Sequence, residues 1–159
     1  MISFFSEETD FTLKGKRLIS KWLRQTAKDN GRRIGVLNYI FCSDPYLLQI
    51  NRQFLGHDYY TDIITFDYSD DYEGQYPKGT ISGDIYISID TVRANGLEYG
   101  EGFEREIMRV IAHGLLHLIG YDDVTAELQA EMTRQENLAL DLLQTLRDEA
   151  CCSGSRNQG

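Results

Sequence analysis

The segment Phe103 to Asp123, FEREIMRVIAHGLLHLIGYDD, constrains this chain more than any other. Its apolar residues recur at three- and four-residue steps, the spacing of a helix with buried faces. Two of the chain's three histidines, His113 and His117, lie one helical turn apart on it, close enough for both imidazoles to reach one metal ion. Gly120 can end the helix in a left-handed conformation, and Asp123 follows the turn. We therefore predict a metal site formed by His113, His117 and Asp123 on this helix and the turn after it.

Two other interpretations of the histidine pair stay open. Both imidazoles can be packed core residues, although burying an unpaired polar group costs about 1–3 kcal/mol. The spacing H-x-x-x-H-x-x-G-x-x-D is also that of metzincin peptidases, with aspartate in place of their third histidine. Such a peptidase needs a glutamate directly after the first histidine as its base, and Gly114 cannot take a proton. A zinc metallopeptidase is therefore an alternative that lacks its base.

Length and composition predict one domain. The chain has 159 residues and is 42% hydrophobic, enough for a single core. We expect residues 1–150 to form this domain and residues 151–159 to be a disordered tail. No run approaches a membrane span, and the acidic N-terminal segment does not resemble a signal peptide, so we expect a cytoplasmic protein without a membrane partner. Cys42 and the adjacent Cys151 and Cys152 are not spaced like metal ligands.

The charge distribution leaves a nucleic-acid partner possible. The net charge is −9, which argues against one, but eight of the sixteen Lys and Arg residues fall between Lys14 and Arg33. Such a run is either a solvated helix face or a surface that binds a polyanion. If it binds phosphates, we expect Arg24 and Lys28 to contribute.

The order of predicted elements defines the fold class. Ser82-Gly83 interrupts one strand and indicates a bulge or a close backbone approach. The order β, α, β, α, β, β, α, α, α predicts an α+β domain with a mixed four-stranded sheet packed against helices. We expect strands at Ile2–Phe5, Arg33–Cys42, Ile63–Phe66 and Thr80–Ile89, and helices at Thr12–Asp29, from Ser43 to near Gly56, at Ser88–Asn95, from Phe103 to Gly120, and at Thr125–Glu149.

Three separate motifs resemble one known family. HGLLHLIGYDD, at positions 113–123, resembles the H-G-x-L-H-L-x-G-Y-D-H signature of the YbeY family, metal-dependent endoribonucleases of bacterial ribosomal RNA maturation. Asn51-Arg52, Phe54, Asp58 and the run from Thr61 to Phe66 look like its N-R-x-[YF]…D…T-[DN]-V-L-S-F block. Gly83-Asp84-Ile85 resembles its G-D-I strand.

The resemblance implies a function and a set of site residues. It implies a single-strand endoribonuclease that matures the 3′ end of small-subunit ribosomal RNA and acts in ribosome quality control, with RNA and the ribosome or its proteins as partners and not DNA. The implied metal ligands are His113, His117 and Asp123, with Asp123 in the place of the usual histidine. We expect one Zn²⁺ ion, although a carboxylate ligand can shift the preference toward other divalent metals such as iron or manganese. Leu55 stands where the family often has arginine, so Arg52 is the nearest candidate for a phosphate contact and joins both histidines as a catalytic candidate.

Other residues are weaker candidates. His57, Asp58 and Asp84 can carry protons or support the ligands, but each also has an ordinary structural role. Tyr121 can pack behind the ligands or touch substrate. A ribosome assembly factor with a purely structural metal remains the alternative outside the enzymes.

Overall fold

A four-stranded mixed sheet forms the centre of the protein. The computed structural model describes residues 1–57 and 61–157. The strand order is β1-β2-β4-β3, in which β1, β2 and β4 run parallel and β3 pairs antiparallel with β4. The strands are β1 (Ile2–Glu7), β2 (Arg33–Cys42), β3 (Ile63–Asp67) and β4 (Thr80–Ser88).

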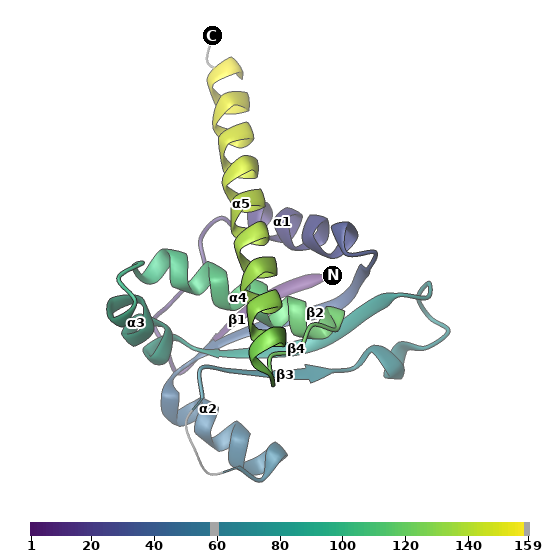
Figure 1. Cartoon of the computed structure of the whole chain (residues 1–159), viewed down its shortest axis with the longest axis vertical. Helices are drawn as coiled ribbons and strands as arrows, with labels where there is room; N and C mark the ends of the chain where they lie inside the picture. Colours follow the sequence, from purple (N-terminus) through teal and green to yellow (C-terminus); the bar gives the residue numbers. More distant parts are fainter. Residues whose placement is uncertain (58–60, 158–159) are drawn as a thin grey trace.

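The helices divide unequally between the two faces of the sheet. Helices α1, α4 and α5 lie together on one face, and α2 lies on the other side (Figure 1). The main core fills the space between the sheet and the larger helical layer, whereas α2 covers a small second cluster that includes Cys42, Leu47 and Ile64. The helices are α1 (Lys16–Asp29), α2 (Asp44–Ile50), α3 (Ile89–Glu98), α4 (Phe103–Ile119) and α5 (Ala126–Asn157), with a short π-helical turn η1 (Asn51–Leu55) and a 3₁₀ turn η2 (Ser69–Tyr72).

The predicted fold class and element order are confirmed, and the differences lie at element ends. Helix α1 begins at Lys16 rather than Thr12, because Gly15 takes a left-handed conformation just before it. Helix α3 continues through Gly96, which was expected to follow its end. A Cβ at Gly96 would lie 3.0 Å from the Gly102 backbone, so this glycine permits a close approach of α3 to the start of α4. Helix α5 extends to Asn157 and thus includes most of the segment that we expected to be a disordered tail.

The predicted irregularity at Ser82-Gly83 combines a bulge with a close contact. The register shifts between Ile34 and Leu37, so two residues of β2 oppose Ser82 alone. The Ser82 hydroxyl accepts a hydrogen bond from the Val36 amide at 3.0 Å. At Gly83, an added Cβ would lie 2.4 Å from the Phe66 carbonyl oxygen. A side chain at this position would therefore force the β3–β4 pair to shift.

The Gly83→Ala substitution is expected to lower the free energy of unfolding by about 1–3 kcal/mol, the cost of inserting an atom into a packed interior. The added methyl would collide with backbone, which cannot rotate away as a side chain can. Urea denaturation in the presence of a chelator would measure the change without a contribution from bound metal. An unchanged midpoint would contradict this close packing.

The length and apolarity of the helices can be compared with those of a membrane span. Among those in the described residues, none combines the length and the apolarity needed to cross a bilayer.

Candidate metal centre

Helix α4 presents both histidines at the edge of the core. Its inner face packs so closely on the sheet that a Cβ at Gly114 would lie 2.8 Å from the Ile85 side chain. His113 and His117 lie on the flank of this face, with side chains 21% and 25% exposed. The helix ends at Gly120, whose φ of 126° suits a residue without a Cβ. The chain then turns back and brings Asp123 to the histidines.

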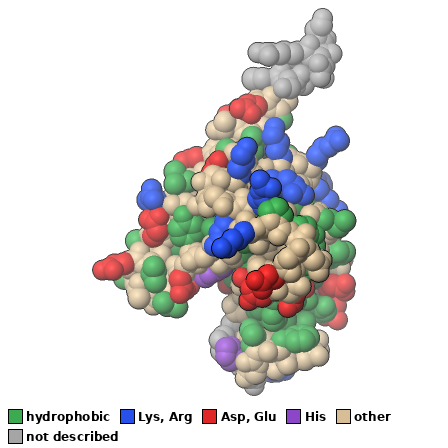
Figure 2. All heavy atoms as spheres, turned by 90° about the vertical axis from the view of Figure 1, so that its right-hand side faces the viewer, with side chains coloured by type: hydrophobic (Ala, Val, Ile, Leu, Met, Phe, Trp, Pro, Cys, Tyr) green, Lys and Arg blue, Asp and Glu red, His purple; other side chains and the backbone are tan. Residues whose placement is uncertain are grey.

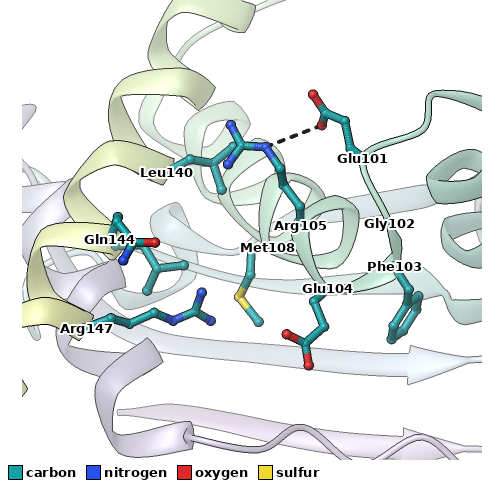
Figure 3. Close-up of a pocket in the computed structure, with 10 residues that line it drawn as sticks. Glu101, Gly102, Phe103, Glu104, Arg105, Met108, Leu140, Gln144 and Arg147 are labelled. Atoms are coloured by element: carbon teal, nitrogen blue, oxygen red, sulfur yellow. Dashed lines mark ion pairs between the residues drawn. The ribbon is translucent and has the colours of Figure 1, made fainter. Parts of the chain in front are cut away.

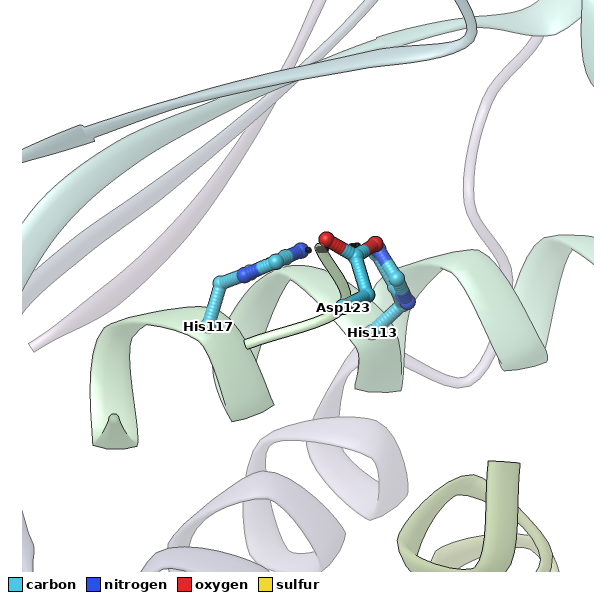
Figure 4. A group of neighbouring side chains, drawn as sticks. All are labelled: His113, His117 and Asp123. Carbon is cyan, nitrogen blue, oxygen red and sulfur yellow. Dashed lines mark hydrogen bonds and ion pairs between the residues drawn. The ribbon is translucent and has the colours of Figure 1, made fainter. Parts of the chain in front are cut away.

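Three ligand atoms converge on one point. The Nε2 atoms of His113 and His117 are 3.0 Å apart, and each lies 3.5 Å from Asp123 Oδ2. Figure 4 shows both rings on the same side of α4 with the carboxylate between them. In a tetrahedral zinc site with bonds of about 2.0–2.1 Å, neighbouring ligand atoms lie about 3.3 Å apart. The group therefore fits a single ion, and three protein ligands leave a coordination position open.

A buried carboxylate that the sequence analysis missed fixes the orientation of His113. Glu136 of α5 lies 2.7 Å from His113 Nδ1 through Oε2, and its other oxygen accepts a hydrogen bond from Arg109 at 3.1 Å. Because a carboxylate oxygen accepts hydrogen bonds, His113 donates its Nδ1 proton to Glu136 and directs Nε2 toward the point where the three ligand atoms converge. The sequence did indicate that Glu136 is buried, because it stands four residues after Met132 and four before Leu140, within the apolar stripe of α5.

The electrostatics around His113 favour a nearby positive charge. Burial alone would lower the pKa of His113, but the hydrogen bond and charge of Glu136, with the charges of Asp123 and Asp62, raise the pKa above its usual range. When His113 is protonated on both ring nitrogens, a metal ion must displace the proton on Nε2 in order to bind there. The same carboxylates that favour the proton also favour a divalent cation.

The structure corrects the role considered for Asp84. Side chains alternate along a strand, and Ile85 of β4 faces α4. Asp84 therefore points to the opposite face of the sheet, where it accepts hydrogen bonds from Asn38 at 3.0 Å and Tyr68 at 3.0 Å. It cannot support the ligands or carry protons at this site.

The remaining candidates lie in the turn after α4 and in or near η1. Tyr121 packs against the core, and its hydroxyl donates to Asn30 Oδ1 at 2.7 Å, so it packs behind the turn. Arg52 lies in η1, and the His57 amide donates to the Asn51 carbonyl just after that turn. Asp58 lies outside the described residues.

Gly114 also explains why this site lacks the base of a zinc peptidase. A side chain at this position would point at Ile85 and Ile63 of the sheet and not at the ligand point. A glutamate there would have neither room nor the correct direction.

A separate pocket lies between the first turns of α4 and the second half of α5 (Figure 3). It is lined by apolar residues and by opposite charges, including Glu104, Arg105 and Arg147. The three proposed ligands do not line it, so this pocket is not part of the metal centre.

Fold and site together define an α+β protein whose central helix and following turn bring together three side chains that could hold a metal ion. Residues 2–144 match the family model described as Endoribonuclease YbeY. Curated relatives named Endoribonuclease YbeY include one from Cytophaga hutchinsonii, 50% identical over 89% of this chain and 94% of its own length. Another, from Phocaeicola vulgatus, is 45% identical over 90% of this chain and 99% of its own. The solution structure of TM1509 from Thermotoga maritima superposes with a TM-score of 0.59 and 27% identity, covering 94% of this chain and 93% of that one.

The chain belongs to the YbeY endoribonuclease family, so the resemblance inferred from its motifs is confirmed.

Proposed function

We propose that this protein is a metal-dependent endoribonuclease that cuts single-stranded RNA during ribosomal RNA maturation. The convergence of the His113, His117 and Asp123 ligand atoms within 4.8 Å of one another carries the proposal, together with membership of a family named for this activity. We propose the 3′ end of small-subunit ribosomal RNA as the substrate region, the ribosome as partner, a part in ribosome quality control, and the cytoplasm as location.

The protein's own residues prepare this site for one ion. His113 and His117 would each contribute a ring nitrogen and Asp123 an oxygen, and the contact of Glu136 with His113 Nδ1 leaves Nε2 of that ring facing the ion. We propose Zn²⁺ as the ion, because two nitrogens and one oxygen at these separations suit its tetrahedral preference; other divalent transition metals suit the same ligands. Such an ion supplies Lewis acidity and lowers the pKa of a coordinated water toward about 7.

We assign Arg52 the binding of a substrate phosphate. It is an exposed cation in η1, and the guanidinium group suits phosphate oxygens well. Leu55, which stands where the family often has arginine, is 43% exposed in the same turn and offers no charge. Arg52 is therefore the basic side chain of this segment that can take up that role.

The two alternatives have less support. A peptidase would need a base at position 114, where the packing against the sheet excludes one. A purely structural metal would not need an open coordination position, whereas the three ligands leave one.

The native protein with one metal ion is expected to cleave an unstructured oligoribonucleotide, and to leave double-stranded RNA, single-stranded DNA and casein intact. A chelator should abolish cleavage because it would remove the Lewis acid that His113, His117 and Asp123 would hold, and added Zn²⁺ or Mn²⁺ should restore it. Gel analysis of end-labelled substrates measures each activity. Cleavage of casein with RNA spared would favour a peptidase, and inactivity of the fully loaded protein on RNA would favour an assembly factor.

A further inference from the structure

Two shallow hollows on α1 and the turn after it join into one basic surface. The first is lined by one side of α1 and the second by its last turn and the start of β2, and both include Arg24 and Lys28. Neither hollow has an acidic residue in its lining. We define the basic surface by its cationic side chains, which are Arg17, Lys21, Arg24, Lys28, Arg32 and Arg33.

The charges of this surface are not neutralised by the protein. In residues 1–57 and 61–157, none of its lysines or arginines forms a salt bridge. The one acid between positions 14 and 33, Asp29, accepts a hydrogen bond from Gln25 at 2.7 Å. Burial and, after it, the nearby charge of Arg24 lower the pKa of the Met1 amino group.

The basic surface lies on a protein that is acidic overall, so it determines where an anionic ligand binds. The whole chain carries a net charge of −9, yet Figure 2 shows Lys and Arg side chains gathered over the upper part of one face, with Asp and Glu side chains above, beside and below them. A polyanion is repelled by most of the molecule and attracted here. The charge pattern therefore both selects and orients an anionic ligand.

The basic surface ends beside the turn between His117 and Asp123. Arg32 Nη2 donates to the carbonyl oxygen of Ile119 at 3.0 Å, at the end of the helix that carries both histidines. Asn30, which caps the C-terminus of α1, accepts the Tyr121 hydroxyl at 2.7 Å, within the turn between His117 and Asp123. Two hydrogen bonds thus hold the end of α1 against the turn that supplies the third ligand.

We propose that the basic surface binds the phosphate backbone of the single-stranded RNA substrate on one side of the cleavage point. This rests on the proposed function, and it adds where the strand lies: along the exposed side of α1, past Arg32, to the metal centre. Arg17 to Lys28 spans about 16 Å of helix axis, long enough for several successive phosphates. Contacts with phosphates carry no base-sequence information, so they would position the RNA backbone whatever its sequence.

The test is the salt dependence of RNA binding by the Arg24→Ala/Lys28→Ala double variant. For single strands the slope of log affinity against log salt changes by about 0.7 per lost phosphate contact, so two lost contacts flatten it by about 1.4. Affinity should fall about tenfold at 0.15 M salt. Fluorescence anisotropy of a labelled oligouridylate measures binding, with a chelator present so that the strand stays intact.

A matched control removes the same net charge elsewhere. Arg105 and Arg134 are cations on α4 and α5, with side chains 51% and 63% exposed, and their double alanine variant should keep the native slope. The exchange Arg24→Lys/Lys28→Arg keeps both charges and should do the same. Equal flattening by the two alanine pairs, or an unchanged slope for Arg24→Ala/Lys28→Ala, would overturn the proposal.

Kinetics separate this proposal from the proposed function. The Arg24→Ala/Lys28→Ala variant should raise KM about tenfold and leave kcat and metal content unchanged, since neither residue contacts the ligands. If the native protein binds oligouridylate with the expected salt slope but never cleaves it, the proposed endoribonuclease activity would be wrong and RNA binding by the basic surface would be supported. If the Arg24→Ala/Lys28→Ala variant cleaves RNA like the native protein and its salt slope is unchanged, RNA binding by the basic surface would be wrong and the endoribonuclease activity would be supported. An acidic protein would then be the better candidate ligand for this surface.

Discussion

The His117→Ala variant is expected to retain less than about one-tenth of the metal of the native chain and to cleave single-stranded RNA at least about a hundredfold more slowly. Loss of a residue that merely supports a ligand costs about 10–100-fold in metal affinity or activity, so loss of a ligand should cost at least as much. The remaining pair, His113 and Asp123, holds an ion at two points only. Elemental analysis gives the metal stoichiometry, and single-turnover cleavage gives the rate.

The effect of His117→Ala should be separable from unfolding. The side chain is 25% exposed, so its removal opens no large cavity in the core. Circular dichroism and the thermal midpoint in chelator should therefore resemble those of the native protein. Native-like metal content would contradict the ligand set, and metal loss with unchanged cleavage would contradict metal catalysis.

Variants of the two adjacent aspartates test the third ligand. Asp123→Ala should weaken metal binding, while Asp123→His should retain it because imidazole is an equally suitable ligand. Asp122→Asn is the matched control. The Asp122 carboxylate accepts the Asp123 amide at 2.7 Å, and among the described residues the group that could hold a metal does not include it. Its amide analogue keeps that hydrogen bond and should leave the metal in place. Equal loss in Asp122→Asn and Asp123→Ala would argue against a specific Asp123 ligand.

Much of this arrangement was predictable because local spacing determined it. Helical periodicity puts His113 and His117 on one face wherever the helix lies, and Gly120 makes the return of Asp123 sterically possible. Dense β-branched and aromatic runs marked β2 and β3. Helix ends were less predictable because they depend on contacts between distant segments, as with Gly96, whose place inside α3 reflects the neighbouring Gly102 backbone.

Two residues show what sequence spacing does not reveal. A chemical role for Asp84 was considered beside a structural one, and alternation along β4 separates its side chain from those that face α4. Glu136 was missed because α5 was interpreted through its leucines. A carboxylate in a buried stripe needs a partner, and here the partners are Arg109 and His113, which no spacing rule connects with position 136.

Glu136→Gln is expected to weaken metal binding about 10–100-fold, the usual cost of losing the partner of a ligating histidine. Glutamine matches the shape of glutamate and can still accept a hydrogen bond, but it lacks the negative charge that stabilises His113 beside a cation. Competition titration against a fluorescent zinc chelator measures the affinity. Because Glu136 acts through His113, excess metal should restore most of the RNA cleavage.

Glu131→Gln is the matched control on the same helix. The Glu131 side chain is 40% exposed and pairs with Arg134, whereas that of Glu136 is 10% exposed and pairs with Arg109; both substitutions remove one carboxylate from α5. Glu131→Gln should bind metal like the native chain, and equal affinities in the two variants would mean that the contact with His113 does not support the ion. If Glu136→Gln stayed inactive with metal fully bound, Glu136 would have a role in the reaction beyond holding the ligand. Recovery with excess metal is the outcome that the 2.7 Å contact to Nδ1 predicts, because that contact orients a nitrogen that binds the ion and leaves the open coordination position untouched.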